Sequence, residues 1–172
     1  MKIDLRVDAE RATDVDSIRA VHRDAFGQEV EGAIVDALRD AGALTISLVS
    51  RINDVVCGHV ALSPMQTPTP TARVLGLGPI GVRTDGQRSG IGTALMHAAI
   101  EQARGDGFDG IVVLGHPEYY TRFEFVPASR FGIRCEYDVP DDVFMALELS
   151  PSGLTDCAGL VRYHAAFGLA TT

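Results

Sequence analysis

A glycine-rich turn around residue 90 holds the residues with the clearest capacity for chemistry. The segment Gln87-Arg88-Ser89-Gly90-Ile91-Gly92-Thr93 leads from a strand-like apolar run into a helical pattern. Glycine has no Cβ, so a ligand can approach the main chain closely. The first N–H groups of a helix have no internal partner and carry partial positive charge, which suits a phosphate or pyrophosphate. Arg88 adds a positive charge, and Ser89 and Thr93 add hydroxyl donors.

Three phosphate-binding patterns compete for this turn. The P-loop needs a lysine after its second glycine, and Lys2 is the only lysine of the chain, so that pattern is excluded. The dinucleotide fingerprint needs a third glycine at position 95, which is leucine. The third pattern, [QR]-x-x-G-x-[GA], is met by Gln87, Gly90 and Gly92. Taken alone, this hexapeptide fits either a cofactor loop or a plain structural turn.

The positions of the glycines favour a cofactor loop. The chain has 172 residues and 18 glycines, above a usual share of about 7%. More than half of these glycines lie between residues 76 and 115. Just upstream of the turn, Gly78, Pro79 and Gly81 interrupt a strand-like run, and such residues weaken regular strand pairing. We therefore expect this strand to part from its neighbour, with a bulged edge strand that binds no ligand as the alternative.

Hydrophobic periodicity predicts the elements that position the turn. A strand at Val74–Arg83, a helix at about Gly90–Arg104 and a strand at Ile111–Leu114 should form a right-handed crossover with parallel strands. The early hairpin and the late strands should be antiparallel. We expect an α/β fold of the mixed α+β kind, with a mixed, mostly antiparallel sheet of about seven strands, a central parallel β–α–β crossover and flanking helices. The other expected strands are 3–7, 45–51, 55–62, 131–137, 143–149 and an edge strand at 159–163, and the other helices are 13–25, 30–38 and 117–123.

Length and composition favour one packed domain over residues 1–172. Hydrophobic residues make up 46% of the chain, which is too many for a disordered protein. No apolar run approaches roughly 18 residues, so we expect no membrane-spanning helix, and Asp4 argues against a signal peptide. The cysteines have no metal-binding spacing, and we interpret them as core residues in a reducing cytoplasm, with one disulfide as the alternative. These are Cys57, Cys135 and Cys157.

The charge distribution argues against nucleic acid as a partner. The net charge is −8, from 15 basic and 23 acidic residues, whereas a nucleic-acid binder needs a basic face. Residues 73–104 nevertheless carry more positive than negative charges, which permits one anionic cofactor. The residues concerned are Arg73, Arg83, Arg88 and Arg104 against Asp85 and Glu101.

The turn and its surroundings resemble the GNAT superfamily of N-acetyltransferases. In that superfamily the pattern [QR]-x-x-G-x-[GA] is the acetyl-CoA pyrophosphate loop. The Leu77-Gly78-Pro79 strand, Gly58-His59-Val60 and the Tyr-Tyr-x-Arg-Phe run at 119–123 are similar to its YhbS-like branch. The resemblance spans about residues 3–167 and is specific between 76 and 127. It implies a GNAT fold and acetyl-CoA as the co-substrate, with no metal.

The resemblance also implies roles for individual residues. Ile80 and Val82 on the parted strand would bind the pantetheine arm, and the Val82 N–H would polarise the thioester carbonyl. Tyr120 matches the tyrosine of the superfamily's final helix and would protonate the leaving thiolate, with Tyr119 as a substitute. Glu124 stands where the superfamily has glycine. The pyrophosphate would lie against Gln87, Arg88, Ser89, Gly90, Ile91, Gly92 and Thr93.

The resemblance does not identify the general base. Many superfamily members use a glutamate on the parted strand, but residues 74–83 contain no acidic residue. His116 follows the apolar strand beside the expected gap, and histidine as a residue type titrates near neutral pH. A solvent-facing loop histidine is the alternative for His116, and a chain of water molecules is the alternative base. His59 lies in an apolar strand, where a hydrogen-bonded core histidine is the better interpretation.

We therefore predict an N-acetyltransferase that moves an acetyl group from acetyl-CoA to a primary amine by direct attack in a ternary complex. The acceptor would be a small molecule or a protein, and the acidic surface favours cationic acceptors. An acyl-CoA-binding sensor or regulatory module without turnover is the first alternative, and a plain interaction domain is the second. Many proteins of this fold form homodimers, and no sequence feature decides this property here.

Overall fold

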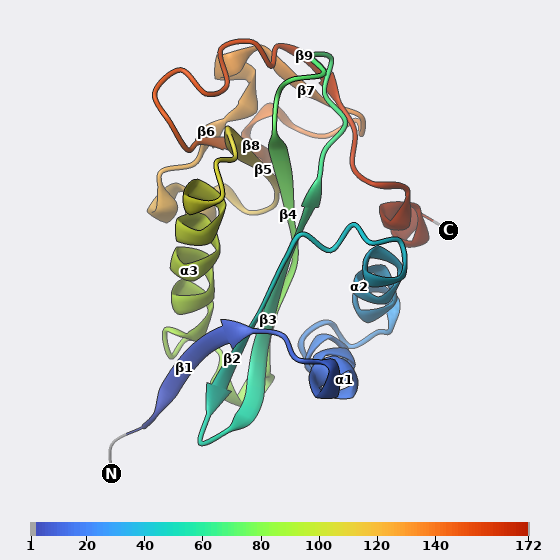
Figure 1. Ribbon diagram of the computed structural model, residues 1–172, viewed down its shortest axis with the longest axis vertical. Coiled ribbons are helices and arrows are strands. Elements are labelled where there is room, and N and C mark those ends of the chain that lie inside the picture. Colours follow the sequence, from blue (N-terminus) through green and yellow to red (C-terminus); the bar gives the residue numbers. More distant parts are fainter. Residues whose placement is uncertain (1–2, 172) are drawn as a thin grey trace. The chain divides into compact units, whose positions relative to one another are not determined.

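The computed structural model describes residues 3–171, and within them seven strands form the main sheet (Figure 1). Hydrogen bonding connects these strands in the order β1-β2-β3-β4-β5-β8-β6. The chain divides into two compact units. The first contains the described residues up to Leu62 together with Gly78–Ala99 and Ala165 onward, and the second contains Ser63–Leu77 and Ile100–His164. The seven strands are β1 (Leu5–Ala9), β2 (Ile46–Ile52), β3 (Val55–Pro64), β4 (Val74–Val82), β5 (Gly110–Leu114), β6 (Val126–Pro127) and β8 (Phe144–Glu148).

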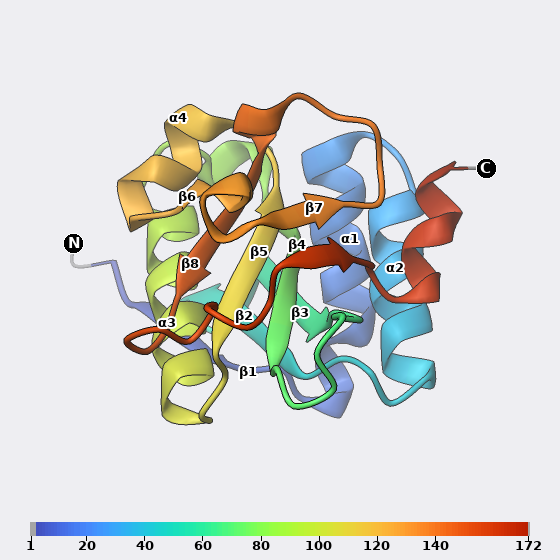
Figure 2. The same cartoon turned by 90° about the horizontal axis from the view of Figure 1, so that it is seen from above.

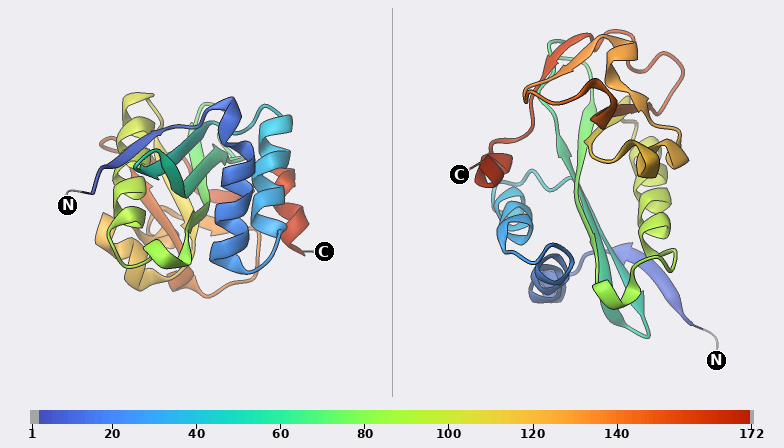
Figure 3. Two further views of the ribbon diagram at one scale, coloured as in Figure 1. Left: turned by 90° about the horizontal axis from the view of Figure 1, so that it is seen from below. Right: turned by 180° about the vertical axis from the view of Figure 1, so that it is seen from behind.

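In the first unit, two helices cover one face of an antiparallel group of strands. The strands β1, β2 and β3 pair in sequence, as the hairpin pattern predicts. The helices α1 (Val15–Phe26) and α2 (Val30–Asp40) lie side by side against them (Figures 1 and 3). Their apolar faces and the strands share one buried cluster, made of Ile18, Val21, Val35, Val49, Val56 and Ala61. A C-terminal 3-10 turn (Ala165–Thr171) packs Ala166 against α2.

Helix α1 shows how local sequence sets the limits of an element. Its buried residues recur at helical spacing, and one of them is the polar residue His22. The helix ends at Gly27, which has a φ of 68° and whose N–H donates to the Arg23 carbonyl at 2.9 Å. Glycine adopts this left-handed conformation without the usual steric penalty, so it terminates the helix.

The long strand β4 and helix α3 (Ile91–Gly105) form the predicted central crossover with β5. The strands β4 and β5 are parallel, and their register covers Val74–Gly76 against Gly110–Val112. The pairing of β4 with β5 therefore ends before the segment in which Gly78, Pro79 and Gly81 were expected to disturb it. Within this segment the Gly78–Pro79 peptide bond is cis.

The second unit contains the antiparallel strands β5, β8 and β6 and a separate two-stranded sheet (Figure 2). Strands β7 (Ile133–Cys135) and β9 (Gly159–Val161) make up that small sheet and run parallel. The unit has its own buried cluster, which includes Val112, Phe144 and Leu154. Helix α4 (Pro117–Tyr120) and a following 3-10 turn (Thr121–Phe123) occupy the predicted position of the short helix.

One predicted strand pairs with an unexpected partner. The expected edge strand at Gly159–Tyr163 does not belong to the main sheet, because its residues Gly159–Val161 pair with β7. Tyr163 lies beyond the pairing, and its N–H donates to the Glu136 carboxylate at 2.7 Å. The seventh strand of the main sheet is instead the two-residue β6, which pairs with β8.

Two further findings concern the cysteines and the lengths of the helices. All three cysteines are free; Cys57 and Cys157 are buried, as expected of core residues, and Cys135 is half-buried. Between residues 3 and 171 no helix is both long and apolar enough to cross a bilayer.

Candidate functional site

The glycine-rich turn begins directly after β4 and ends at the first turn of α3. A short 3-10 turn (Thr84–Gly86) leads into it. Arg88 and Gly90 both have left-handed backbones, with φ of 61° and 89°. A Cβ built at Gly90 would meet no atom within 4 Å, so the space in front of this backbone is open. The turn therefore presents its backbone and the exposed Arg88 side chain to solvent.

Two side chains of the turn bind its own backbone. The Gln87 amide Nε2 donates to the Val82 carbonyl at 3.0 Å and fastens the turn to the end of β4. The Ser89 hydroxyl donates to the Gly86 carbonyl. These two donors hold the shape of the turn, so the N–H groups at the start of α3 and Arg88 are the groups best suited to meet an anion. Ile91 is buried, whereas Gly92 and Thr93 are half-buried.

The end of β4 packs closely against α1 because Gly81 has no side chain. Gly81 is buried between the half-buried residues Ile80 and Val82. A Cβ at Gly81 would lie 2.9 Å from Nδ1 of His22 and 3.4 Å from the Ala25 Cβ. Glycine at this position thus allows the α1 side chains to approach the β4 backbone.

His22 belongs to a buried hydrogen-bonded pair. Its Nε2 lies 2.8 Å from Nδ1 of His59, and both rings have 0% exposed surface. Nε2 of His59 lies 2.8 Å from the hydroxyl of Ser47 on β2. Burial lowers the pKa of His22 to about 4 and lowers that of His59 well below its usual value, so both rings are neutral near pH 7.

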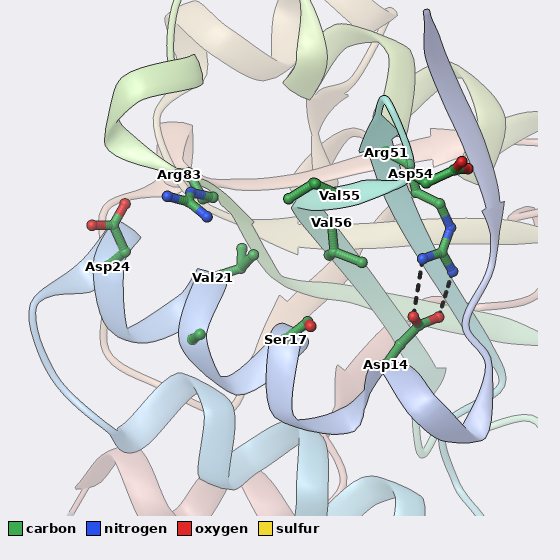
Figure 4. A pocket seen from close by; sticks show the side chains of 10 residues that line it. Asp14, Ser17, Val21, Asp24, Arg51, Asp54, Val55, Val56 and Arg83 are labelled. Carbon is green, nitrogen blue, oxygen red and sulfur yellow. Dashed lines mark hydrogen bonds and ion pairs between the residues drawn. The ribbon is translucent and has the colours of Figure 1, made fainter.

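A pocket of about 460 Å³ opens in the first unit between α1, the β2–β3 hairpin and the end of β4 (Figure 4). Its side chains include Asp14 and Arg51, which form a bidentate ion pair at 3.0 and 2.5 Å. These side chains are 6% and 5% exposed, and the Arg51 hydrogen bonds lower the pKa of Asp14. At the other side of the pocket, Asp24 accepts hydrogen bonds from the N–H and hydroxyl of Thr84. The pocket charges are therefore already engaged within the protein.

In the second unit, Tyr120 ends α4 with its ring 8% exposed. The ring makes edge contacts with Tyr119 and Phe125, at centroid distances of 5.0 and 5.8 Å. A Cβ at Gly115 would lie 2.5 Å from the Tyr120 ring, so this glycine makes room for it. Burial, with a smaller contribution from Tyr119, raises the pKa of Tyr120 to about 12, so the phenol keeps its proton at neutral pH.

His116 and Glu124 lie four residues before and four residues after Tyr120, and both are exposed. His116 is exposed at the N-cap of α4, and its carbonyl accepts the N–H of Tyr119 at 3.1 Å. Glu124 stands at the position of the superfamily's glycine and has a φ of 70°. The turn after α4 thus forms with glutamate in the left-handed conformation, where glycine would be less strained. Its N–H donates to the Thr121 carbonyl at 3.1 Å.

Comparisons with known proteins identify the family. The family model described as "Acetyltransferase (GNAT) family" matches residues 15–125. The chain belongs to this family. It is 30% identical to the N-acetyltransferase YhbS of Escherichia coli K12 over 155 residues, which cover 90% of this chain and 93% of the relative. The enzyme is therefore a GNAT acetyltransferase, and the predicted family and fold are confirmed.

Two solved structures of GNAT acetyltransferases are similar to this enzyme. One is E. coli YhbS in complex with CoA, with a TM-score of 0.93, 28% identity and coverage of 98% of this chain and 94% of that one. The other is a GNAT acetyltransferase from Brucella melitensis in complex with acetyl-CoA. It has a TM-score of 0.81 and 37% identity, and the match covers 95% of this chain and 98% of that one.

The turn of this GNAT acetyltransferase fits a cofactor that carries phosphates. The open space at Gly90 would be filled by any side chain, and the left-handed backbone there favours glycine. The helix that follows has 15 residues, long enough for a dipole at its N-terminus. Among residues 3–171, no group of three or more His, Cys, Asp or Glu side chains is placed to hold a metal ion.

Sequence reasoning missed the connection between the two buried histidines. His22 shares the helical spacing of the apolar residues of α1, and His59 lies in an apolar strand, so each could be recognised as buried. Nothing in the local pattern indicates that their rings meet or that they lie against Gly81.

Proposed function

We propose that this GNAT acetyltransferase transfers the acetyl group of acetyl-CoA to a primary amine of a small molecule or protein by direct attack in a ternary complex. The observation that carries the proposal is the open backbone at Gly90, with left-handed φ and no atom within 4 Å of an added Cβ. The relatives with CoA and acetyl-CoA bound support acetyl-CoA as the co-substrate. Acetyl-CoA would supply the acetyl group as a thioester.

The residues of this enzyme would then hold and orient acetyl-CoA and exchange protons with the reacting groups. Arg88 and the first N–H groups of α3 would bind the pyrophosphate, while Gln87 and Ser89 keep the turn in shape. Backbone groups at Ile80 and Val82 would bind the pantetheine arm and polarise the thioester carbonyl. Hydrogen bonds from preorganised donors of this kind are strong in a site that excludes water.

Proton donors and acceptors complete the proposal. Tyr120 would donate its hydroxyl hydrogen to the leaving sulfur, and its raised pKa keeps that hydrogen in place before the reaction. His116, whose ring is exposed at the start of α4, is one candidate for the base, and a chain of water molecules is another. The net charge of −8 favours cationic amines as acceptors.

The binding experiment compares two glycine variants with matched strain. Gly90 and Gly42 both have positive φ, 89° and 69°, and an added Cβ meets no atom within 4 Å at either. Gly90→Ala should weaken acetyl-CoA binding by about tenfold or more, about 1.4 kcal/mol, because the Cβ enters the space proposed for the pyrophosphate. Gly42→Ala should leave the Kd unchanged. Calorimetry that finds equal Kd values for Gly90→Ala and the wild type would refute the loop assignment.

The activity experiment identifies the acceptor class. Release of free thiol from acetyl-CoA is measured with spermidine, kanamycin and a lysine-rich peptide. We expect thiol release with at least one of these cations. Tight acetyl-CoA binding with no release for any amine would favour the sensor alternative.

A further inference from the structure

Ser47, His59 and His22 form a continuous chain of hydrogen bonds inside the first unit. The two links, from Ser47 to His59 and from His59 to His22, both measure 2.8 Å. A neutral histidine has one donor and one acceptor nitrogen. The protons of this hydrogen-bonded chain therefore have two consistent arrangements. The ring N–H groups donate either in the direction of Ser47 or in the direction of His22. A chain of this kind can pass a proton and reverse its direction.

The inner end of the chain is an unsatisfied nitrogen. Nδ1 of His22 is buried and has no hydrogen-bond partner among the described residues. A buried polar atom without a hydrogen bond destabilises the folded protein, so its presence calls for an explanation. The atom lies against Gly81, where a Cβ would come within 2.9 Å of it. The chain thus ends beside the β4 backbone, between Ile80 and Val82.

The outer end of the hydrogen-bonded chain, Ser47, is partly exposed, and a surface side chain covers the ring of His22 at the inner end. Ser47 is half-buried on β2, whereas both rings are fully buried. On α1, the Phe26 ring stacks on His22 with centroids 5.9 Å apart and an interplanar angle of 14°. Phe26 is 43% exposed, so one face of the His22 ring is covered by a surface side chain.

We propose that Ser47, His59 and His22 are a proton relay that receives the proton released by the acceptor amine beside β4. This proposal rests on the proposed function, which places the thioester at Ile80 and Val82. It gives a role to the unsatisfied nitrogen, to the hydrogen-bonded chain behind it and to the glycine in front of it.

The relay moves one proton and leaves no net charge in the core. As the amine nitrogen bonds to the acetyl carbon and the carbon–sulfur bond breaks, an amine N–H bond breaks and its proton passes to Nδ1 of His22. The Nε2 proton of His22 moves to Nδ1 of His59, and the Nε2 proton of His59 moves to the Ser47 oxygen. The Ser47 hydroxyl proton leaves to solvent, the leaving sulfur takes its proton from Tyr120, and the Tyr120 phenolate takes one proton back from solvent, so that no net charge remains. The resting chain must therefore carry its protons on both Nε2 atoms.

Burial explains why a relay suits this place better than one histidine. Because burial lowers the pKa of both rings, Nδ1 of His22 offers a lone pair at neutral pH. A positive charge that stayed on a fully buried ring would be costly. Transfer of the second proton to His59 and the third to Ser47 avoids that charge.

Kinetics with serine variants test the relay. Ser47→Ala should lower kcat about tenfold or more, because the relay loses its outlet, without changing the KM for acetyl-CoA. Ser47→Thr, which restores a hydroxyl, should recover kcat. Ser150→Ala, in an exposed serine that follows β8, is the matched control and should leave kcat unchanged. A wild-type kcat in folded Ser47→Ala would overturn the relay.

Histidine variants separate the relay from the alternative base. His22→Gln should lower kcat about 100-fold or more, whereas His116→Gln should have a much smaller effect. The reverse result, a large loss for His116→Gln and none for His22→Gln, would overturn the relay and assign the base to His116.

A spectroscopic test does not depend on turnover. Nitrogen-15 NMR of the histidine rings in the wild-type protein, without acceptor, should show both His22 and His59 protonated on Nε2 at pH 7. Protonation of His22 on Nδ1 would overturn the relay. If the wild type releases no thiol with any amine tested, the proposed acceptor class fails, while the ring spectra still decide the relay.

Discussion

His22 should make the free energy of unfolding decrease when the pH is lowered from 8 to 5. Burial lowers its pKa from 6.5 to about 4 in the folded protein. In the unfolded chain His22 takes up a proton near its ordinary pKa, whereas the folded protein stays neutral at this residue until about pH 4. Between the two pKa values the unfolded state binds more protons, so acid favours unfolding.

The size of this effect follows from the pKa difference. At pH 5 the unfolded histidine is about 1.5 pH units below its pKa, and each unit is worth about 1.4 kcal/mol, so His22 contributes a loss of about 2 kcal/mol. His59 acts in the same direction, because burial and the charges of His22 and Arg39 lower its pKa. The pKa of Asp14 is also lowered, but its stabilising effect is lost only below its ordinary value of 3.8. The window from pH 8 to pH 5 therefore isolates the histidines from this carboxylate.

The measurement is urea unfolding at pH 8 and pH 5 for the wild type, His22→Leu and Ile18→Val. The difference between the two pH values is taken within each variant, so that any general destabilisation cancels. In His22→Leu this difference should be smaller than in the wild type by about 2 kcal/mol. Ile18, a buried apolar residue of the same helix, is the control; Ile18→Val removes no titratable group and should leave the difference intact. A His22→Leu protein with the full wild-type difference would refute the reasoning.

Contacts inside each unit support three further predictions. Asp14→Ala should lower the free energy of unfolding by about 3–5 kcal/mol, because it removes the bidentate partner of the buried Arg51, and Asp14→Leu with Arg51→Met should recover most of that loss in urea unfolding. Gly81→Ala should cost about 1–3 kcal/mol by the same measurement, since its Cβ would crowd His22, and adding His22→Ala should reduce the cost. Tyr120→Phe should lower kcat about tenfold or more with an unchanged Kd for acetyl-CoA; an unchanged kcat would remove its hydroxyl from the mechanism.

Features encoded by neighbouring residues could be predicted from the sequence. The turn at Gln87–Thr93 requires glycine where φ is positive and a helix start directly after it, and the residues at these positions specify both. The crossover β4–α3–β5 could be predicted because its two strands are short apolar runs and the helix between them has a hydrophobic period. Arg88 is the exception, since its left-handed backbone has no signal in its residue type. In the same way, glutamate at position 124 does not indicate the left-handed turn there, whereas glycine would have indicated it.

Features that depend on pairing between distant residues could not be predicted in this way. The strand at Gly159–Val161 has the composition of an edge strand, but it joins β7 rather than the main sheet. The strands β7 and β9 have three residues each, and β6 has two, so none is long enough to show a period of its own. Their partners are chosen by the packing of the second unit, which local residue types do not encode.

The contact between His22, His59 and Gly81 combines both kinds of information. The sequence indicates that each histidine is buried and that Gly81 weakens a strand, and the structure shows these properties in a single contact. In the β2–β3 register Ser47 faces Ala61, so His59 is its diagonal neighbour and can reach it. The φ of Gly81 is not positive, so the backbone conformation does not require glycine. Glycine is required there because the His22 ring of α1 lies too close for a Cβ. A glycine interpreted as a source of irregularity therefore has a second purpose, because it allows a basic nitrogen to lie directly against the strand proposed to bind the thioester.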